Sequence, residues 1–188
     1  GALSAVLPYS KTVFTVPSNI SIYGTMNTAD RSIDQIDIAL RRRFKFEPML
    51  PDADIIASEL ELSSIDANNI EGVDLIKLFN TLNNRIELLL DSQHLLGHAL
   101  FIGVKNADDI ANVIRNSVIP LLDDIQKIQL VFNDLNDTGE LRDDAIYEHL
   151  TLEADSFFSY MGDYMIDDKK HYHVKETITA DIIKHIYE

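Results

Sequence analysis

The sequence predicts an α/β segment followed by a mostly helical domain. Up to Pro51, short apolar stretches alternate with polar residues and are interrupted by turn-forming residues, which is typical of strands. Beyond Pro51, apolar residues recur every three or four positions, which indicates helices. The chain has 188 residues and 46% of them are hydrophobic, so it is long and apolar enough to bury a core.

Two short strands are predicted near the start of the chain. Residues 7–17 contain a turn-forming Pro8 and then alternate through Val13 and Thr15, which favours a hairpin or an edge strand. A second apolar strand is expected over residues 20–23.

A helix and a further strand complete the predicted α/β unit. Ser32 is a good N-cap for a helix over residues 33–40, and residues 44–50 return to an alternating pattern. In this order, the polar loop over residues 24–31 follows the carboxyl end of a strand. Open α/β sheets bind their ligands at that edge, so this loop is the first place to look for a site.

Helical spacing dominates the middle of the chain. It predicts helices over residues 52–62, 72–90 and 108–133, with a kink or a break at Pro120 in the last of them. A connector with two glycines, residues 91–103, separates the second helix from the third.

The tail from residue 138 is less regular but is expected to be mostly helical. A closing helix is predicted after an N-cap at Thr177 or Thr179. The apolar runs at residues 88–90 and 157–158 are expected to lie in the core.

The formal net charge of −15 is unevenly distributed. Residues 1–51 hold six Lys and Arg against four acids, whereas the remainder holds ten against 27. A long acidic region repels phosphate backbones, so extensive direct nucleic-acid binding is disfavoured and an anion site belongs in the first 51 residues. The absence of cysteine excludes disulfides, and no apolar run is long enough to cross a bilayer, which favours a cytoplasmic protein.

The polar loop combines three kinds of side chain that suit a nucleotide phosphate. Asn27 supplies an amide that orients water without adding charge, Asp30 a carboxylate and Arg31 a cation. Ten residues later, the predicted helix ends in three consecutive arginines, residues 41–43. Short polar turns and cationic helix ends also occur for purely structural reasons, but three arginines exceed what a helix end requires.

This region resembles the part of AAA+ NTPases between the sensor-1 strand and the arginine finger, and within that group the McrB type. The resemblance is carried by MNTADRS, by the Ala-Leu-Arg-Arg-Arg-Phe block and by the strand that ends in Pro51 and Asp52. Downstream, the Asn-x-Arg-Ile core at residues 83–86, the following Gly-His turn and the Ile-Pro-Leu-Leu stretch at residues 119–122 resemble that family's helical lid.

The resemblance implies catalytic roles for four residues. Asn27 matches sensor 1, which holds the attacking water, and Asp30 lies in the Asn-Thr-Ala-Asp element that organises the active site. Arg42 and Arg43 match the arginine fingers that act on the nucleotide of the neighbouring subunit.

The resemblance also implies a nucleotide, GTP or ATP with Mg2+. Thr28 and Arg31 would contact it from the loop, and Gly97 and His98 from the place where the lid approaches it.

Two elements of that family are missing from these residues. There is no G-x-x-x-x-G-K-[ST] phosphate loop (Walker A) and no apolar strand ending in Asp-Glu (Walker B). The chain is therefore expected to be the C-terminal part of a motor domain, monomeric and inactive alone. Its expected domains are the end of the AAA+ core over residues 1–51, a lid over 52–137 and a C-terminal extension over 138–188.

The resemblance implies partners for the full-length protein. These are a homo-oligomeric ring, expected to be a hexamer, and an McrC-like nuclease subunit, with DNA bound through regions outside this chain and no membrane. Nucleotide hydrolysis would then power DNA translocation in a modified-DNA restriction complex. Two alternatives stay open, namely an ATP-dependent remodelling relative and a non-catalytic interaction module.

The histidines give little support for a metal site. His94 and His98 lie four residues apart, but Gly97 interrupts any helical metal-binding face between them, and no H-E-x-x-H pattern occurs. His171 and His173 have strand spacing and are expected on a surface strand.

Overall fold

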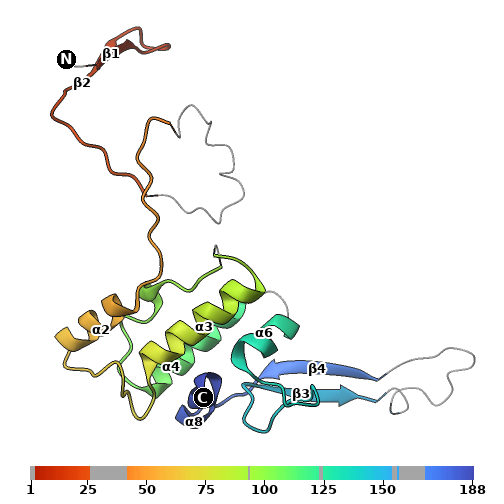
Figure 1. Ribbon diagram of the computed structural model, residues 1–188. Helices are drawn as coiled ribbons and strands as arrows, with labels where there is room; N and C mark the ends of the chain where they lie inside the picture. The colour runs from red at the N-terminus through yellow and green to blue at the C-terminus, as the bar shows by residue number, and fades with distance from the viewer. Residues whose placement is uncertain (1–2, 26–41, 93, 123–124, 154–155, 157–167) are drawn as a thin grey trace, which may run out of the picture. The chain divides into compact units, whose positions relative to one another are not determined.

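The computed structural model describes residues 3–25, 42–92, 94–122, 125–153, 156 and 168–188. These residues fall into two compact units, Gly1–Phe44 and Lys45–Glu188 (Figure 1). Each unit is described by itself below.

The first unit contains one β-hairpin. Strands β1 (Leu3–Val6) and β2 (Val13–Val16) pair antiparallel, in register from Leu3 opposite Val16 to Val6 opposite Val13. The turn is closed by hydrogen bonds between Leu7 and Thr12 and between Lys11 and Leu7, each 3.0 Å long. Of the two expected alternatives for residues 7–17, a hairpin forms, but its first strand lies before the predicted range.

Two other predicted strands do not form. Residues 20–23 and 45–50 have no regular secondary structure. A strand exists only through hydrogen bonds to a neighbour, and no neighbouring strand lies beside either stretch among the described residues. The predicted helix over residues 33–40 lies outside the described residues.

The second unit begins with two capped helices. Helix α2 (Ala53–Leu62) has Asp52 as its N-cap, whose carboxylate accepts a hydrogen bond from the Asp54 N–H at 2.9 Å. Helix α3 (Leu75–Leu89) is capped in the same way by Asp74, which accepts from the Lys77 N–H at 2.8 Å. Both predicted helices are confirmed, the second with a later start.

A short 3-10 helix, η2 (His98–Leu100), follows, and then a helical run that is broken into pieces. The run consists of α4 (Ala107–Val113), a π-helical segment η3 (Ile114–Val118), α5 (Ile119–Leu121) and α6 (Ile125–Phe132). The first three pieces are contiguous, so the chain stays helical through Pro120. Pro120 explains the π segment, because its ring has no N–H to donate and needs a wider preceding turn. The distortion lies where the sequence predicted a kink or a break.

The C-terminal segment differs from the prediction. Its described residues form a second antiparallel hairpin of β3 (Tyr147–Leu152) and β4 (Lys169–Val174), and only then helix α8 (Ala180–Tyr187). In Figure 1 this hairpin extends from the helical body of the unit. The prediction of a mostly helical segment over residues 138–188 was wrong for these residues, because cross-strand pairing joins residues from 17 (Leu152 with Lys169) to 27 (Tyr147 with Val174) positions apart, which no local pattern links.

Two smaller predictions about this segment are confirmed. Thr179 is the N-cap of α8, with its hydroxyl 3.4 Å from the Ile182 N–H. His171 and His173 lie exposed on β4, as expected for a surface strand.

One continuous hydrophobic core fills the second unit. Helix α3 contributes five of its members, and α8 adds Ile183 and Ile186 from the far end of the sequence. Ile146 and Ile178 belong to the same core, so it crosses the domain boundary that was expected at residue 138. The α3 members are Leu75, Leu78, Phe79, Leu82 and Ile86.

The expectation that residues 88–90 form core was wrong in part. Leu88 is 86% exposed and Leu89 is 37% exposed, whereas Leu90 packs against the core. Helical geometry explains the difference, because Leu82 and Ile86 define the buried face of α3 and Leu88 lies away from it. Residues 157–158 lie outside the described residues.

No helix in the described part of the chain is long and apolar enough to span a bilayer.

Candidate functional site

Most of the predicted phosphate loop lies outside the described residues. This holds for Asn27, Thr28, Asp30 and Arg31, and for the first of the three arginines, Arg41. Their roles remain predictions.

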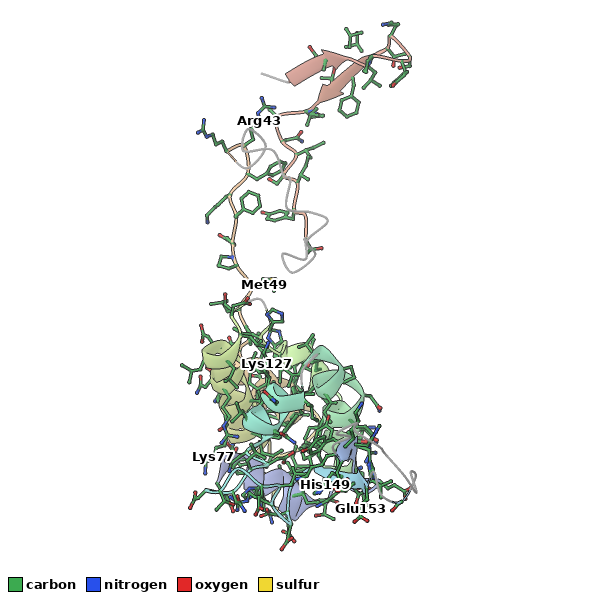
Figure 2. The ribbon with its side chains drawn as sticks, turned by 90° about the vertical axis from the view of Figure 1, so that its right-hand side faces the viewer. Arg43, Met49, Lys77, Lys127, His149 and Glu153 are labelled. Carbon is green, nitrogen blue, oxygen red and sulfur yellow. The ribbon has the colours of Figure 1, made fainter. Side chains whose placement is uncertain are left out.

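The other two arginines lie in a turn over residues 42–44 of the first unit. Arg42 and Arg43 are both exposed, and neither guanidinium has a hydrogen bond or an ion pair within the described ranges (Arg43 is labelled in Figure 2). Lys45, by contrast, pairs with Glu47. Exposed guanidinium groups of this kind can bind a phosphate.

The predicted lid residues Gly97 and His98 lie in the second unit, at the start of η2. The backbone N–H of Asp52 donates a hydrogen bond to Nδ1 of His98 at 3.3 Å, across 46 residues of sequence. The N-cap of α2 is therefore joined to the Gly97–His98 turn. The structure brings these two predicted residues together with Asp52, which sequence reasoning had placed only at the end of a strand.

The side-chain amide of a buried asparagine holds this turn in place. Asn83 on α3 accepts a hydrogen bond from the Leu96 N–H at 2.7 Å and donates one to the Leu96 carbonyl at 3.2 Å. Both Asn83 and Leu96 are buried. The sequence had shown Asn83 only as part of the Asn-x-Arg-Ile pattern, and a polar residue on the apolar face of α3 was the signal that could have identified it.

The arginine of the same pattern ties α3 to two other helices. Arg85 donates from one Nη to the Val131 carbonyl at 2.9 Å and to the Ile186 carbonyl at 2.6 Å, near the ends of α6 and α8. Partial burial lowers the pKa of Arg85 from its ordinary value. Its role is structural, because it satisfies carbonyls that helix ends leave without partners.

A second polar cluster lies between the α6–β3 connection and α8. Asp134 is buried, with Oδ1 accepting from the Ile146 N–H at 2.9 Å and Oδ2 without a partner in the described chain. Burial raises the pKa of Asp134 to about 6, against the opposing effect of its backbone hydrogen bonds and of Lys175 and His185. His185 itself contacts Asp144, with Nδ1 3.2 Å from Oδ2.

Two further histidines form isolated pairs with acids. His94 lies 2.8 Å from Asp91, and His173 lies 3.1 Å from Glu148 across the β3–β4 hairpin. No group of three or more His, Asp or Glu side chains within the described ranges is arranged to hold a metal ion.

Comparisons with known proteins first identify the helical part. Residues 74–129 match the family model of the McrB α-helical lid domain. They include α3 with its Asn83 and Arg85, the Gly97–His98 turn and the helices interrupted at Pro120.

A curated relative extends the match beyond the lid. The chain is 32% identical over 120 residues to the type IV methyl-directed restriction enzyme EcoKMcrB subunit of Escherichia coli K12, and the match covers 59% of this chain. Residues 74–129 therefore carry an McrB-type lid, and the similarity to an McrB subunit confirms the predicted resemblance. The matched region spans 26% of that relative's length.

Proposed function

We propose that this chain is part of a ring-forming AAA+ NTPase of a modified-DNA restriction system, in which GTP or ATP hydrolysis powers DNA translocation. The observation that carries the proposal is the McrB lid over residues 74–129, preceded by two exposed arginines that have no partner among the described residues. The lid closes one side of the nucleotide site of its own subunit. Arg42 and Arg43 act on the nucleotide of the next subunit, and such a finger contributes a factor of about 10³–10⁵ to the rate.

The remaining roles follow the same scheme. Asn27 orients the attacking water, Asp30 organises the site, and Thr28 and Arg31 contact the nucleotide. Residues 1–51 form the end of the α/β core, and the lid begins at residue 52. Because the continuous core of the second unit crosses residue 138, we take the lid to extend to α8.

The described residues suit one side of a nucleotide. Gly97 leaves open space beside its backbone, and His98 has a ring nitrogen without a partner among the described side chains. When bound with Mg2+, the nucleotide supplies the phosphoryl group that is hydrolysed. The chain's own described residues contribute the lid surface and the two cations.

The proposed partners are further copies of this chain in a hexameric ring and a nuclease subunit of the McrC type. The ring follows from the proposed finger role, because a cation that acts on a nucleotide bound elsewhere needs a neighbouring subunit to supply that nucleotide.

The direct test is nucleotide turnover by the native-length protein, with GTP and with ATP, for the wild type and Arg43→Ala. We expect turnover by the wild type and a loss of at least about a hundredfold in kcat for the variant. Lys45→Ala is the matched control, since it removes an exposed cation that already has the partner Glu47. Its turnover should match the wild type.

The outcomes separate the alternatives. A preference for ATP would point to a remodelling ATPase instead of a GTP-dependent restriction motor. No turnover with either nucleotide, even after addition of the nuclease subunit, would contradict the proposal and leave a non-catalytic interaction module.

A further inference from the structure

We propose that the β3–β4 hairpin of one copy of this chain docks on the outer face of helix α2 of a second copy. The inference rests on the proposed ring and deepens it, because it names a contact between neighbouring copies that does not involve the arginines. Both surfaces belong to the second unit, Lys45–Glu188.

The hairpin has an outward face that combines an apolar side chain with a basic one. Leu150 on β3 pairs directly with His171 on β4, and Lys169 lies two residues before His171, so the three side chains share one face. All three are exposed, Leu150 to 60%. The opposite face carries Tyr147 and Val174, which pack with the core of the unit. The face with Leu150 is therefore the one that is turned away from the core.

The two strands carry positive charge in an otherwise acidic chain. Strand β4 contains Lys169 and Lys170 and no acid. Strand β3 contains one acid, Glu148, which lies 3.1 Å from His173 of β4 and is paired with it. Neither lysine forms an ion pair within the described residues. The hairpin therefore offers its lysines to an acidic partner.

Helix α2 has an exposed face of complementary character. Ile55, Glu59 and Leu62 lie four and three residues apart, so they share one side of the helix, away from the buried Ile56 and Leu60. Leu62 is 81% exposed and Ile55 is 37% exposed. Residues 52–76 hold seven Asp and Glu and no Lys, Arg or His. Two apolar side chains thus flank a carboxylate within a strongly acidic stretch.

These two faces match in both apolar contact and charge. Leu150 can bury against Leu62 while Lys169 meets the carboxylate of Glu59. A single exposed leucine is common on protein surfaces, but each leucine here stands beside a charge opposite in sign to the charge on the other face. A second copy of this chain therefore fits the hairpin better than nucleic acid, which the surrounding acids would repel.

The positions of the two faces require two copies. In Figure 1, α2 lies at one end of the second unit and the β3–β4 hairpin extends from the other. One copy cannot bring its own two faces together, whereas successive copies arranged head to tail can. A contact between two different surfaces of the same protein is heterologous, and such contacts generate rings when the rotation closes.

Disulfide trapping in the native-length protein tests the contact directly. His171→Cys places a thiol on the outward face of the hairpin, and Ser58→Cys places one on the outer face of α2, where these 188 residues have no cysteine of their own. With a non-hydrolysable analogue of GTP or ATP, we expect a disulfide-linked dimer when the two variants are mixed and none with either alone. Leu88→Cys, at a position 86% exposed on α3, is the control and should not cross-link with His171→Cys.

Loss of the apolar contact should weaken assembly of the ring. Leu150→Asp removes the apolar side chain and places a further acid against α2, so the protein concentration at half-assembly should rise at least about tenfold. Sedimentation velocity with the same nucleotide analogue measures this concentration. Leu88→Asp, which changes a more exposed leucine outside both faces, is the matched control and should leave it unchanged.

The charge pair allows a reciprocal test. Lys169→Glu should raise the concentration at half-assembly about three- to fivefold, and Glu59→Lys in the same chain should reverse most of that rise because attraction is restored. Lys105→Glu, which changes another exposed lysine of the second unit, should have no such effect.

The outcomes distinguish this inference from the proposed function. A wild type that assembles, with no cross-link in the mixture and no shift in Leu150→Asp, would overturn the inference and leave the proposed ring intact. Effects that appear only after addition of the nuclease subunit would also overturn it, because the hairpin would then bind that partner. A wild type that neither assembles nor hydrolyses nucleotide would overturn the inference and the proposed function together.

Discussion

The two units contain similar apolar side chains but bury them to opposite extents. In the first unit, Val6, Phe14 and Ile22 are 62%, 54% and 71% exposed, and no described side chain is buried. In the second unit, Leu78 and Phe79 are at most 1% exposed and belong to a continuous core. Apolar content alone therefore does not decide whether a segment makes a core.

The number of packing partners explains this difference. The described residues of the first unit form two strands of four residues, and an isolated two-stranded hairpin is at best marginally stable in water. The second unit packs helices from both ends of its sequence around α3. The described residues of the first unit therefore offer too few packing partners to bury its apolar side chains.

The largest contrast should come from removing one phenylalanine in each unit. Phe79→Ala deletes a buried ring that packs edge-on against Phe101, with ring centroids 5.6 Å apart, and should lower the free energy of unfolding by about 3–5 kcal/mol. Phe14→Ala should change it by less than about 0.5 kcal/mol. Urea denaturation measures both, and equal effects would show that the first unit shares the core.

The buried Asp134 should make the second unit less stable as the pH rises. Its folded pKa of about 6 lies above the ordinary value of 3.8, so the folded state binds the proton more tightly than the unfolded state. The stabilisation is complete below about pH 4 and is lost as the pH rises through 6, by about 2–3 kcal/mol.

Unfolding measured from pH 4 to 7 in the wild type and Asp134→Asn tests this. The stability of the wild type relative to the variant should fall across that range. Asp137→Asn, in the exposed turn nearby, is the control and should show no such relative change. A constant difference between the wild type and Asp134→Asn would contradict the account.

The two hydrogen bonds between Asn83 and Leu96 should contribute about 2 kcal/mol to the free energy of unfolding. Asn83→Leu leaves the Leu96 N–H and carbonyl without their partners in a buried position, and an unsatisfied buried group costs about 1–3 kcal/mol. Asn84→Leu, one residue further along the same helix and exposed, should change stability by less than about 0.5 kcal/mol. Similar losses of stability in both variants would mean that the stabilisation does not come from the hydrogen bonds between Asn83 and Leu96.

The smallest effect concerns the closing helix. Thr179→Ala removes the N-cap of α8 and should cost about 1 kcal/mol, because the Ile182 N–H loses its acceptor. Thr177→Ala, at the other residue that the sequence allowed as a cap, should be close to neutral. The melting temperature of the whole second unit should fall with Thr179→Ala if α8 belongs to its core, and a local loss of helix without that shift would show α8 to be a separate appendage.

The sequence predicted what depends on neighbouring residues along the chain. Helices α2, α3 and α8 follow from three- and four-residue spacing with Asp or Thr caps, and Pro120 marks a helical distortion because it has no N–H. The McrB resemblance was recognised from short local patterns of the same kind.

Long-range contacts could not be predicted in this way. Three contacts of this kind join residues between 13 and 46 positions apart. They are the pairing of β3 with β4, the hydrogen bond from Asp52 to His98 and the hydrogen bonds between Asn83 and Leu96. The strands expected over residues 20–23 and 44–50 do not form for a related reason. The sequence pattern indicates a possible strand but does not show which neighbouring strand would pair with it.

The central claim is that the two units serve different active sites, with the arginines of one subunit acting on the nucleotide held by another. The most direct measurement mixes two native-length variants, Arg43→Ala and Asn27→Ala, and records GTP and ATP turnover against each variant alone. Each variant should be inactive by itself, and mixing should restore part of the activity, because some interfaces then combine an intact Arg43 with an intact Asn27. A mixture that stays as inactive as its components, although the two variants assemble together, would contradict the claim.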